Sequence, residues 1–169
     1  ACLSDPPRCD RVSAAFAYAW PLAPLIHHYK YAGNLALATL LARALSAHLA
    51  GDADLIIPMP LAPQRLRSRG FNQALEIARV VSRVTGVPLA AHACRRVRDS
   101  TPQAALPWKE RAKNILGAFV CDADLSGMRV AVIDDVMTTG ATLNEIARNL
   151  RQAGAIEIQG WVVARTLPR

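Results

Sequence analysis

The feature that most constrains the fold is the order of apolar and amphipathic segments in the last third of the chain. Residues Arg129 to Ile133 form a continuous apolar run that predicts a buried strand. A turn from Asp134 to Gly140 and an amphipathic helix from Ala141 to Gln152 follow, and Glu157 to Ala164 then predicts another buried strand. Because strand, helix and strand in this order make a parallel pair joined by a crossover helix, the chain predicts an α/β fold.

The rest of the chain predicts further elements of a single domain. Short strands are expected at Ala14 to Trp20 and Asp54 to Pro58, and helices at Leu35 to Leu49 and Asn72 to Thr85. Residues 95–114 are polar, basic and interrupted by prolines, which is typical of a long mobile loop. A length of 169 residues with 52% hydrophobic residues excludes two large domains and also excludes global disorder.

The positive charge of the chain is concentrated in one segment. The net charge is +7, from 20 Lys and Arg against 13 Asp and Glu. Residues 61–115 hold eleven of the basic residues and three of the acidic ones, a balance of +8, so the remaining residues sum to −1. A local excess of this kind indicates a concentrated anion site. The alternative is a solvated basic face with no ligand.

The four cysteines, at positions 2, 9, 94 and 121, show neither a C-x-x-C pair nor a histidine at zinc-finger spacing. They therefore predict neither a complete zinc site nor a disulfide framework, and they are typical of reduced thiols. No apolar run reaches the roughly 18 residues that a membrane span needs, and no charged leader precedes an apolar run with a cleavage site. We expect a cytoplasmic protein with no membrane partner.

The segment from Val130 to Thr142 carries the clearest chemistry. Its apolar strand delivers two adjacent carboxylates, Asp134 and Asp135, to the carboxyl end of a strand, where open α/β sheets bind ligands. The turn that follows is rich in hydroxyls and leads into a helix, so its backbone N–H groups can hold a phosphate. We expect the carboxylates, which repel that anion, to accept hydrogen bonds from sugar hydroxyls or to help place a metal ion.

This run is similar to the 5-phosphoribosyl-1-pyrophosphate (PRPP) signature of type I phosphoribosyltransferases in its apolar strand, acidic pair and T-T-G-A-T loop. The resemblance implies that Asp134 and Asp135 bind the ribose hydroxyls and are the catalytic residues. It also implies that the loop holds the 5-phosphate through Thr138, Thr139, Gly140, Ala141 and Thr142. An ordinary strand-to-helix turn with surface acids is the alternative.

Most of the chain resembles the ComF family of competence-associated, phosphoribosyltransferase-like proteins. Besides the signature, the resemblance rests on His28 to Gly33, Pro58 to Leu61, Arg65 to Gln73, Thr101 to Gln103 and Glu110 to Asn114. It implies a type I phosphoribosyltransferase fold, with a mainly parallel twisted sheet flanked by helices and a small N-terminal hood. Residues 1–24 would be an N-terminal segment holding a zinc-knuckle remnant and the hood strand, and residues 25–169 the phosphoribosyltransferase-like domain.

The same resemblance gives the basic segment a role. Residues 59–70 stand where type I enzymes contact pyrophosphate, and the planar fork of arginine suits phosphate oxygens. The residues expected there are Arg65, Arg67, Arg69 and Gly70. The residues expected on a loop that closes over the ligand are Arg95, Gln103, Arg111 and Asn114. Lys30 is expected near the site from the hood, with an exposed lysine at a helix end as the alternative.

These residues predict a phosphoribosyltransferase that binds PRPP with Mg²⁺ and transfers the phosphoribosyl group to an acceptor, releasing pyrophosphate. ComF proteins usually carry a four-cysteine zinc knuckle, of which only Cys2 is left, so no zinc site is expected and Mg²⁺ would be bound mainly through PRPP. The alternative is a non-catalytic module that senses PRPP or a nucleotide and assists DNA uptake. The family leaves open single-stranded DNA, competence proteins and a second copy of the chain as further partners.

Overall fold

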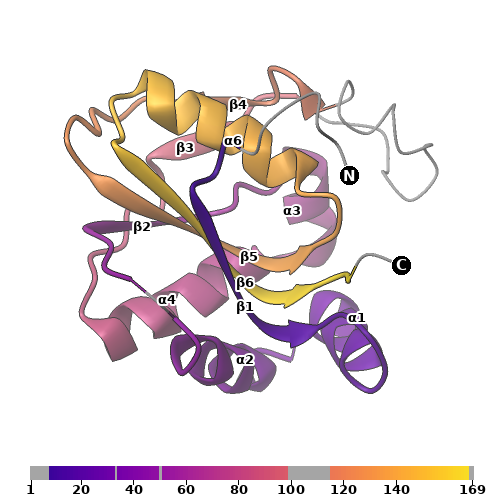
Figure 1. Cartoon of the computed structure of the whole chain (residues 1–169). Coiled ribbons are helices and arrows are strands. Elements are labelled where there is room, and N and C mark those ends of the chain that lie inside the picture. The colour runs from indigo at the N-terminus through magenta and orange to yellow at the C-terminus, as the bar shows by residue number, and fades with distance from the viewer. Residues whose placement is uncertain (1–7, 33, 50, 99–114, 168–169) are drawn as a thin grey trace.

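The fold is built on a four-stranded sheet with helices on both faces (Figure 1). The computed structural model describes residues 8–32, 34–49, 51–98 and 115–167. The strands lie side by side in the order β1 (Arg11–Ala17), β6 (Glu157–Arg165), β5 (Arg129–Met137) and β2 (Leu55–Pro58). Each neighbouring pair is parallel, which confirms the predicted α/β fold.

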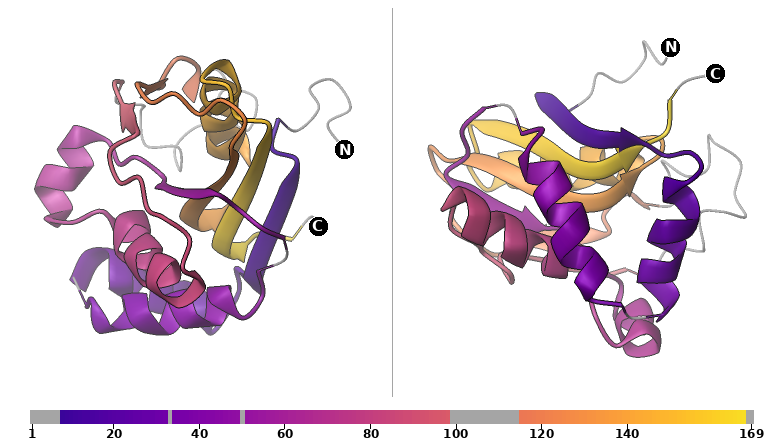
Figure 2. Two further views of the ribbon diagram at one scale, coloured as in Figure 1. Left: turned by 90° about the vertical axis from the view of Figure 1, so that its left-hand side faces the viewer. Right: turned by 90° about the horizontal axis from the view of Figure 1, so that it is seen from below.

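Two helical layers cover opposite faces of this sheet (Figure 2). One face is covered by α6 (Ala141–Gln152) and by an antiparallel ribbon of β3 (Cys94–Arg96) and β4 (Phe119–Cys121). The other is covered by α2 (Ala36–Ser46) and α4 (Gln73–Thr85), which pack against each other. The predicted helices at these three places are confirmed, and α6 has the predicted bounds.

The central strands are apolar on both sides because each side meets a helical layer. Along β5, Val130 and Val132 lie in the core beneath α6, whereas Ala131 and Ile133 lie in the core beneath α2 and α4. Trp161 of β6 is fully buried in the second core. Strands buried on both faces form continuous apolar runs in the sequence, which is why β5 and β6 are recognisable there.

Two further helices were not predicted. Helix α1 (Leu22–Ala32) follows β1, and α3 (Pro63–Arg69) lies between β2 and α4. Asn72 caps α4 by accepting hydrogen bonds from the backbone N–H groups of Ala74 and Leu75, and its side-chain amide donates to the carbonyl of Met59. This cap fixes the chain between the end of β2 and the start of α4.

The structure corrects two expectations about strands. The turn predicted to begin at Asp134 begins later, because β5 continues to Met137 and its last residues pair with β6. The N-terminal strand, expected at Ala14 to Trp20, lies at Arg11–Ala17 and pairs with β6 as an outer strand of the central sheet. In both cases pairing with β6 supplies backbone hydrogen bonds that local sequence preference does not reveal.

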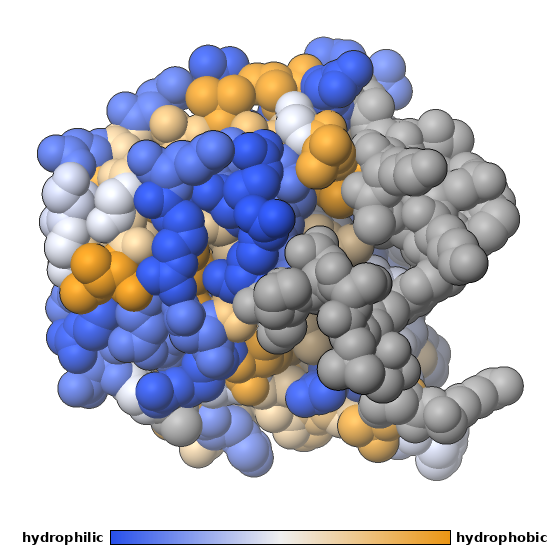
Figure 3. Space-filling view, turned by 45° about the horizontal axis from the view of Figure 1, so that its top comes forward, coloured by the Kyte–Doolittle hydropathy of each residue, from blue (hydrophilic) through white to orange (hydrophobic). Residues whose placement is uncertain are grey.

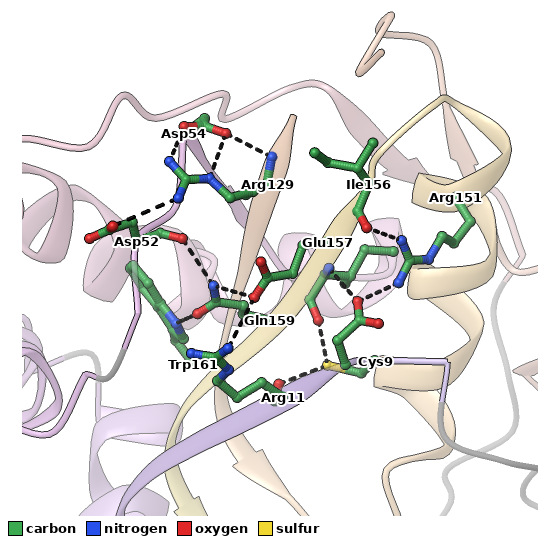
Figure 4. Close-up of polar contacts among 12 residues, drawn as sticks. Cys9, Arg11, Asp52, Asp54, Arg129, Arg151, Ile156, Glu157, Gln159 and Trp161 are labelled. Carbon is green, nitrogen blue, oxygen red and sulfur yellow. Dashed lines mark hydrogen bonds and ion pairs between the residues drawn. The ribbon is translucent and has the colours of Figure 1, made fainter. Parts of the chain in front are cut away.

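Polar side chains tie the strands together at the amino end of the sheet (Figure 4). Arg129 donates two hydrogen bonds from its guanidinium to the carboxylate of Asp54, at 2.8 and 3.1 Å. The side chain of Gln159 accepts from the indole N–H of Trp161 at 3.0 Å and donates to the carbonyl of Asp52 at 3.0 Å. These contacts join β2, β5 and β6 at the end of the sheet away from the acidic pair.

Within the part of the chain that the structure describes, every helix is too short or too polar to cross a bilayer.

Candidate functional site

A cavity of about 500 Å³ opens at the carboxyl end of β5, as expected for a ligand site on an open parallel sheet. Its walls come from the ends of β5 and β2, the first residues of α6 and α4, and helices α1 and α3. Of the predicted site residues, it brings together Lys30, Arg65, Arg69, Asp134, Asp135, Thr138 and Thr142. Segments far apart in the sequence therefore meet at one place.

The two carboxylates of the acidic pair point to opposite sides of the sheet. Because side chains alternate along a strand, Asp134 continues the side of Val132 and faces the α6 layer, while Asp135 continues the side of Ile133. Each carboxylate also accepts the backbone N–H of the next residue, at 2.8 Å for Asp134 and 2.7 Å for Asp135. Both carboxylates nevertheless line the cavity.

Asp135 is only 3% exposed, and its Oδ2 lies 2.9 Å from Nζ of Lys30. Helix α1 holds this lysine in place, because the hydroxyl of the neighbouring Tyr29 donates to the carbonyl of Gln73 at 2.9 Å. Lys30 therefore lies in the cavity wall, near the site as expected. Burial, and then the charge of Asp135, raise the pKa of Asp134, and Lys30 opposes this shift.

The turn after β5 leads into the N-terminus of α6. Gly140 has a φ of 78°, a left-handed conformation that strains any other residue, and it is the N-cap of the helix. A small hollow is lined by Asp134 and by all five residues of the predicted phosphate loop, Thr138 to Thr142. The hydroxyl of Thr139 accepts the N–H of Ala141 at 3.2 Å. Helix dipole, backbone N–H groups and hydroxyls thus converge where an anion would bind.

The predicted pyrophosphate arginines divide into two groups. Arg65 and Arg69 are four residues apart on α3, so they share a helix face, and both line the cavity. Neither forms an ion pair with a described carboxylate. Arg67 and Gly70 are exposed and do not line the cavity. The guanidinium of Arg69 lies 5.1 Å from the ring centroid of Tyr31, which fixes its direction.

The ribbon of β3 and β4 shows that one expected site residue faces away from the cavity and that a neighbouring residue lines it. Arg95, expected to face the ligand, instead forms an exposed ion pair with Asp122 at 2.8 Å. Its neighbour Arg96 lines the cavity, because successive side chains of a strand point to opposite faces. The expectations for Gln103, Arg111 and Asn114 lie outside the described residues. Recognition of the strand at 94–96 in the sequence would have placed Arg96, and not Arg95, on the face with the buried Cys94. Three residues are too few to show the alternating pattern of a strand.

Sequence reasoning also missed Tyr18 and Gln73, which line the same cavity. Gln73 is 7% exposed, and its Oε1 is buried with no hydrogen-bond partner among the described residues. A buried acceptor without a partner is costly, so this oxygen is an unsatisfied polar group of a residue in the cavity wall. Its place in the R-G-F-N-Q block was the signal that could have found it.

No cluster of three or more His, Cys, Asp or Glu side chains within residues 8–32, 34–49, 51–98 and 115–167 could hold a metal ion. Mg²⁺ commonly keeps several waters and uses one or two carboxylates together with substrate phosphates. The pair Asp134 and Asp135 beside a phosphate-type loop fits that mode of binding. It does not fit a protein-only metal cage.

Comparison with known proteins shows the family. Residues 67–167 match the family model described as the phosphoribosyl transferase domain. The chain is 35% identical over 175 residues to Competence protein F of Haemophilus influenzae, which covers 97% of the chain and 76% of that protein. The chain belongs to the competence protein F family. Another member, DNA utilization protein YhgH of Shigella flexneri, is 34% identical over 174 residues, covering 98% of the chain and 77% of that protein.

The fold of this competence protein F relative is that of the type I phosphoribosyltransferases. A solved glutamine PRPP amidotransferase from B. subtilis, complexed with ADP and GMP, superimposes with a TM-score of 0.54 at 21% sequence identity. The match covers 76% of this chain and 26% of the larger chain. At this identity the likeness establishes the fold. The predicted fold class and family resemblance are both confirmed.

Proposed function

We propose that this competence protein F relative binds PRPP together with Mg²⁺ and transfers the phosphoribosyl group to an acceptor. The observation that carries the proposal is the convergence of three features on one cavity: an acidic pair, a helix-capping loop and a set of arginines. PRPP has a matching set of parts, since it joins a 5-phosphate and a pyrophosphate to a ribose with two free hydroxyls. The names of the relatives further support a role in DNA utilization and competence.

In this proposal each part of PRPP meets a complementary group. Backbone N–H groups and hydroxyls of residues 138–142 bind the 5-phosphate at the N-terminus of α6. Asp134 and Asp135 accept hydrogen bonds from the ribose hydroxyls. Arg65 and Arg69 from α3 bind pyrophosphate oxygens. Mg²⁺, when bound, neutralises charge on the leaving pyrophosphate.

The protein's contribution to the reaction is mainly electrostatic and geometric. The bond between the anomeric carbon and the pyrophosphate oxygen breaks, its electron pair leaves with pyrophosphate, and the acceptor's lone pair forms the new bond. Positive charge develops on the ribose ring during this step. Asp135, and Asp134 in its deprotonated form, lie where they can stabilise it, while Arg65 and Arg69 stabilise the negative charge of the departing group.

Calorimetric titration tests the ligand. We expect wild-type protein to bind PRPP with Mg²⁺ and to bind it much less without the metal, because the leaving group's charges are then unscreened. The double variant Asp134→Asn/Asp135→Asn should lose binding. The matched control is Asp124→Asn, which removes an exposed carboxylate from the loop before β5, away from the cavity. This variant should bind like wild type. Wild type that gives neither heat nor a thermal shift at millimolar PRPP would falsify the proposal.

A non-catalytic sensor of PRPP or a nucleotide is the second candidate. The observation in its favour is that Lys30 engages Asp135 in an ion pair at 2.9 Å, so one of the two carboxylates is already compensated. Release of pyrophosphate from bound PRPP across a panel of nucleobase acceptors separates the candidates. An enzyme releases it with at least one acceptor faster than without, whereas a sensor binds PRPP and releases none.

A further inference from the structure

The ribbon formed by β3 and β4 places two cysteines directly opposite each other. Cys94 of β3 and Cys121 of β4 are register partners in this antiparallel pair. Both lie on the same face of the ribbon, since directly opposed residues of antiparallel strands project to the same side. The local sequence gives no sign of this, because residues 95–120 separate the two thiols along the chain.

The hydrogen-bond ladder shows what kind of pair this is. The N–H of Asp122 donates to the carbonyl of Ala93 at 3.1 Å, and the N–H of Val97 donates to that of Ala118 at 2.8 Å. Hydrogen-bonded and non-hydrogen-bonded pairs alternate along antiparallel strands, so the cysteines occupy a non-hydrogen-bonded position. Cα atoms there are about 4.5 Å apart, within the range of about 4.4–6.8 Å that a disulfide spans.

The two thiols occupy facing positions of the ribbon and differ in accessibility. Cys94 is only 6% exposed. Burial, and then the neighbouring Cys121 thiol, raise the pKa of Cys94. Cys121 is half-buried and lines an open depression of about 300 Å³ beside Asn149 and Gln152 of α6. The face that carries α6 is largely hydrophilic (Figure 3), so a small polar reagent can approach this sulfur.

We propose that Cys94 and Cys121 form a reversible disulfide by exchange with a low-molecular-weight disulfide such as oxidised glutathione. The thiolate of Cys121 attacks one sulfur of the small disulfide, forms a mixed disulfide and releases one small thiolate. Cys94 then loses its proton, and its sulfur attacks the sulfur of Cys121 and displaces the second small thiolate. Two protein thiols are oxidised and one small disulfide is reduced to two thiols.

The bond would secure the strand that supplies Arg96 to the cavity. Arg96 follows Cys94 by two residues on the same face of β3, and its guanidinium lies 5.6 Å from the ring centroid of Phe119 on β4. Among the residues that the structure describes, the ribbon has three residues in each strand and no third strand, so backbone pairing alone holds it weakly. The inference does not depend on whether the cavity binds PRPP.

Equilibration of the folded, reduced protein in glutathione buffers of increasing oxidising strength tests this inference. We expect loss of two alkylatable thiols, loss of two hydrogen atoms in the intact mass, and linked peptides that contain positions 94 and 121. Dithiothreitol should restore both thiols. The cross-link should raise the melting temperature by about 5 °C, because it closes a long loop in the unfolded chain.

Serine variants assign the two roles. Cys94→Ser should stop at the mixed disulfide, so that one glutathione stays on Cys121. Cys121→Ser should leave Cys94 unmodified while folded, because Cys94 is buried. Cys9→Ser is the matched control and should behave like wild type, since Cys9 lies elsewhere and its thiol donates to the carbonyls of Arg11 and Ile158. Wild type that keeps both thiols in every buffer, or a cross-link that needs Cys9, overturns the inference.

Discussion

Lys30 and Asp135 form a buried ion pair of 2.9 Å that joins helix α1 to the carboxyl end of β5. The carboxylate is the more deeply buried partner, at 4% side-chain exposure against 22% for the lysine. A buried charge that loses its partner is strongly destabilising, while loss of both charges costs much less. The two residues are therefore coupled in stability as well as in position.

A double-mutant cycle on this pair measures that coupling. We expect Lys30→Met to lower the free energy of unfolding by about 2–4 kcal/mol, since it leaves Asp135 uncompensated. Asp135→Asn in the Lys30→Met background should then restore part of the loss. Urea unfolding of the four proteins is the measurement. Strictly additive effects would show that the pair contributes no mutual stabilisation.

The raised pKa of Asp134 predicts a pH dependence of stability. Because burial and Asp135 raise this pKa above the ordinary value of 3.8, the folded state keeps a proton that the unfolded chain has released. The free energy of unfolding therefore falls as pH rises above that value through the folded pKa. Asp134→Asn lacks this titration, so the stability of the variant should increase relative to wild type as pH rises from about 4 to about 8. Parallel stability curves would contradict the shift.

The arginines of α3 predict a helix-face pattern in ligand binding. Arg65→Ala and Arg69→Ala should each weaken PRPP binding about tenfold, because each removes a charged hydrogen-bond donor from the cavity. Arg67→Ala is the matched control, since Arg67 lies on the same helix and is exposed outside the cavity. Titration calorimetry compares the three. Equal losses at all three positions would indicate a general effect of charge.

The unpartnered oxygen of Gln73 predicts opposite effects on stability and binding. Gln73→Met keeps the side-chain length and removes a buried acceptor that has no described partner, so the free energy of unfolding should rise by about 1 kcal/mol. The same change should weaken PRPP binding if a ligand hydroxyl donates to this oxygen. Thermal melts with and without PRPP measure both effects. A loss of stability would show that the amide is satisfied in the free protein.

The contact between Asp54 and Arg129 predicts acid sensitivity at the amino end of the sheet. Hydrogen bonds from the side chain and backbone of Arg129 lower the pKa of Asp54 from 3.8 to about 2. The stabilisation is therefore present above the ordinary value and is lost as pH falls through the folded pKa. The stability difference between wild type and Asp54→Asn should shrink over that interval. Arg129→Met should reduce the pH dependence of this difference without abolishing it, because the backbone N–H of residue 129 still donates to Asp54 at 2.9 Å.

Elements with strong periodicity and clear end signals could be predicted from the sequence. Helix α4 begins after its cap Asn72 and ends at Gly86, which has a φ of 76°, so both ends are visible in the residue types. Helix α1 was missed because Pro21 and Pro24 suggested irregular chain. Proline in the first turn of a helix removes no intrahelical hydrogen bond, so these residues are compatible with the helix that follows.

The acidic pair and phosphate loop could be located from the sequence because one continuous segment encodes them. Arg96 and Gln73 could not, because their places in the cavity depend on how β3 and α4 pack against β5. Arg67 could not be separated from Arg65 and Arg69 for a similar reason. The basic run shows that three arginines are present, but which of them face the cavity depends on how helix α3 is oriented.

The pairing of β1 with β6 has a consequence for synthesis of the chain. The register partners Arg11 and Gln159 are 148 positions apart in the sequence (159 − 11), so β1 leaves the ribosome long before the strand that it pairs with. Until then β1 has no partner in the sheet and β5 is paired only with β2. Completion of this domain therefore has to wait for the emergence of its last strand, and chains cut short before residue 157 would expose edges that invite association.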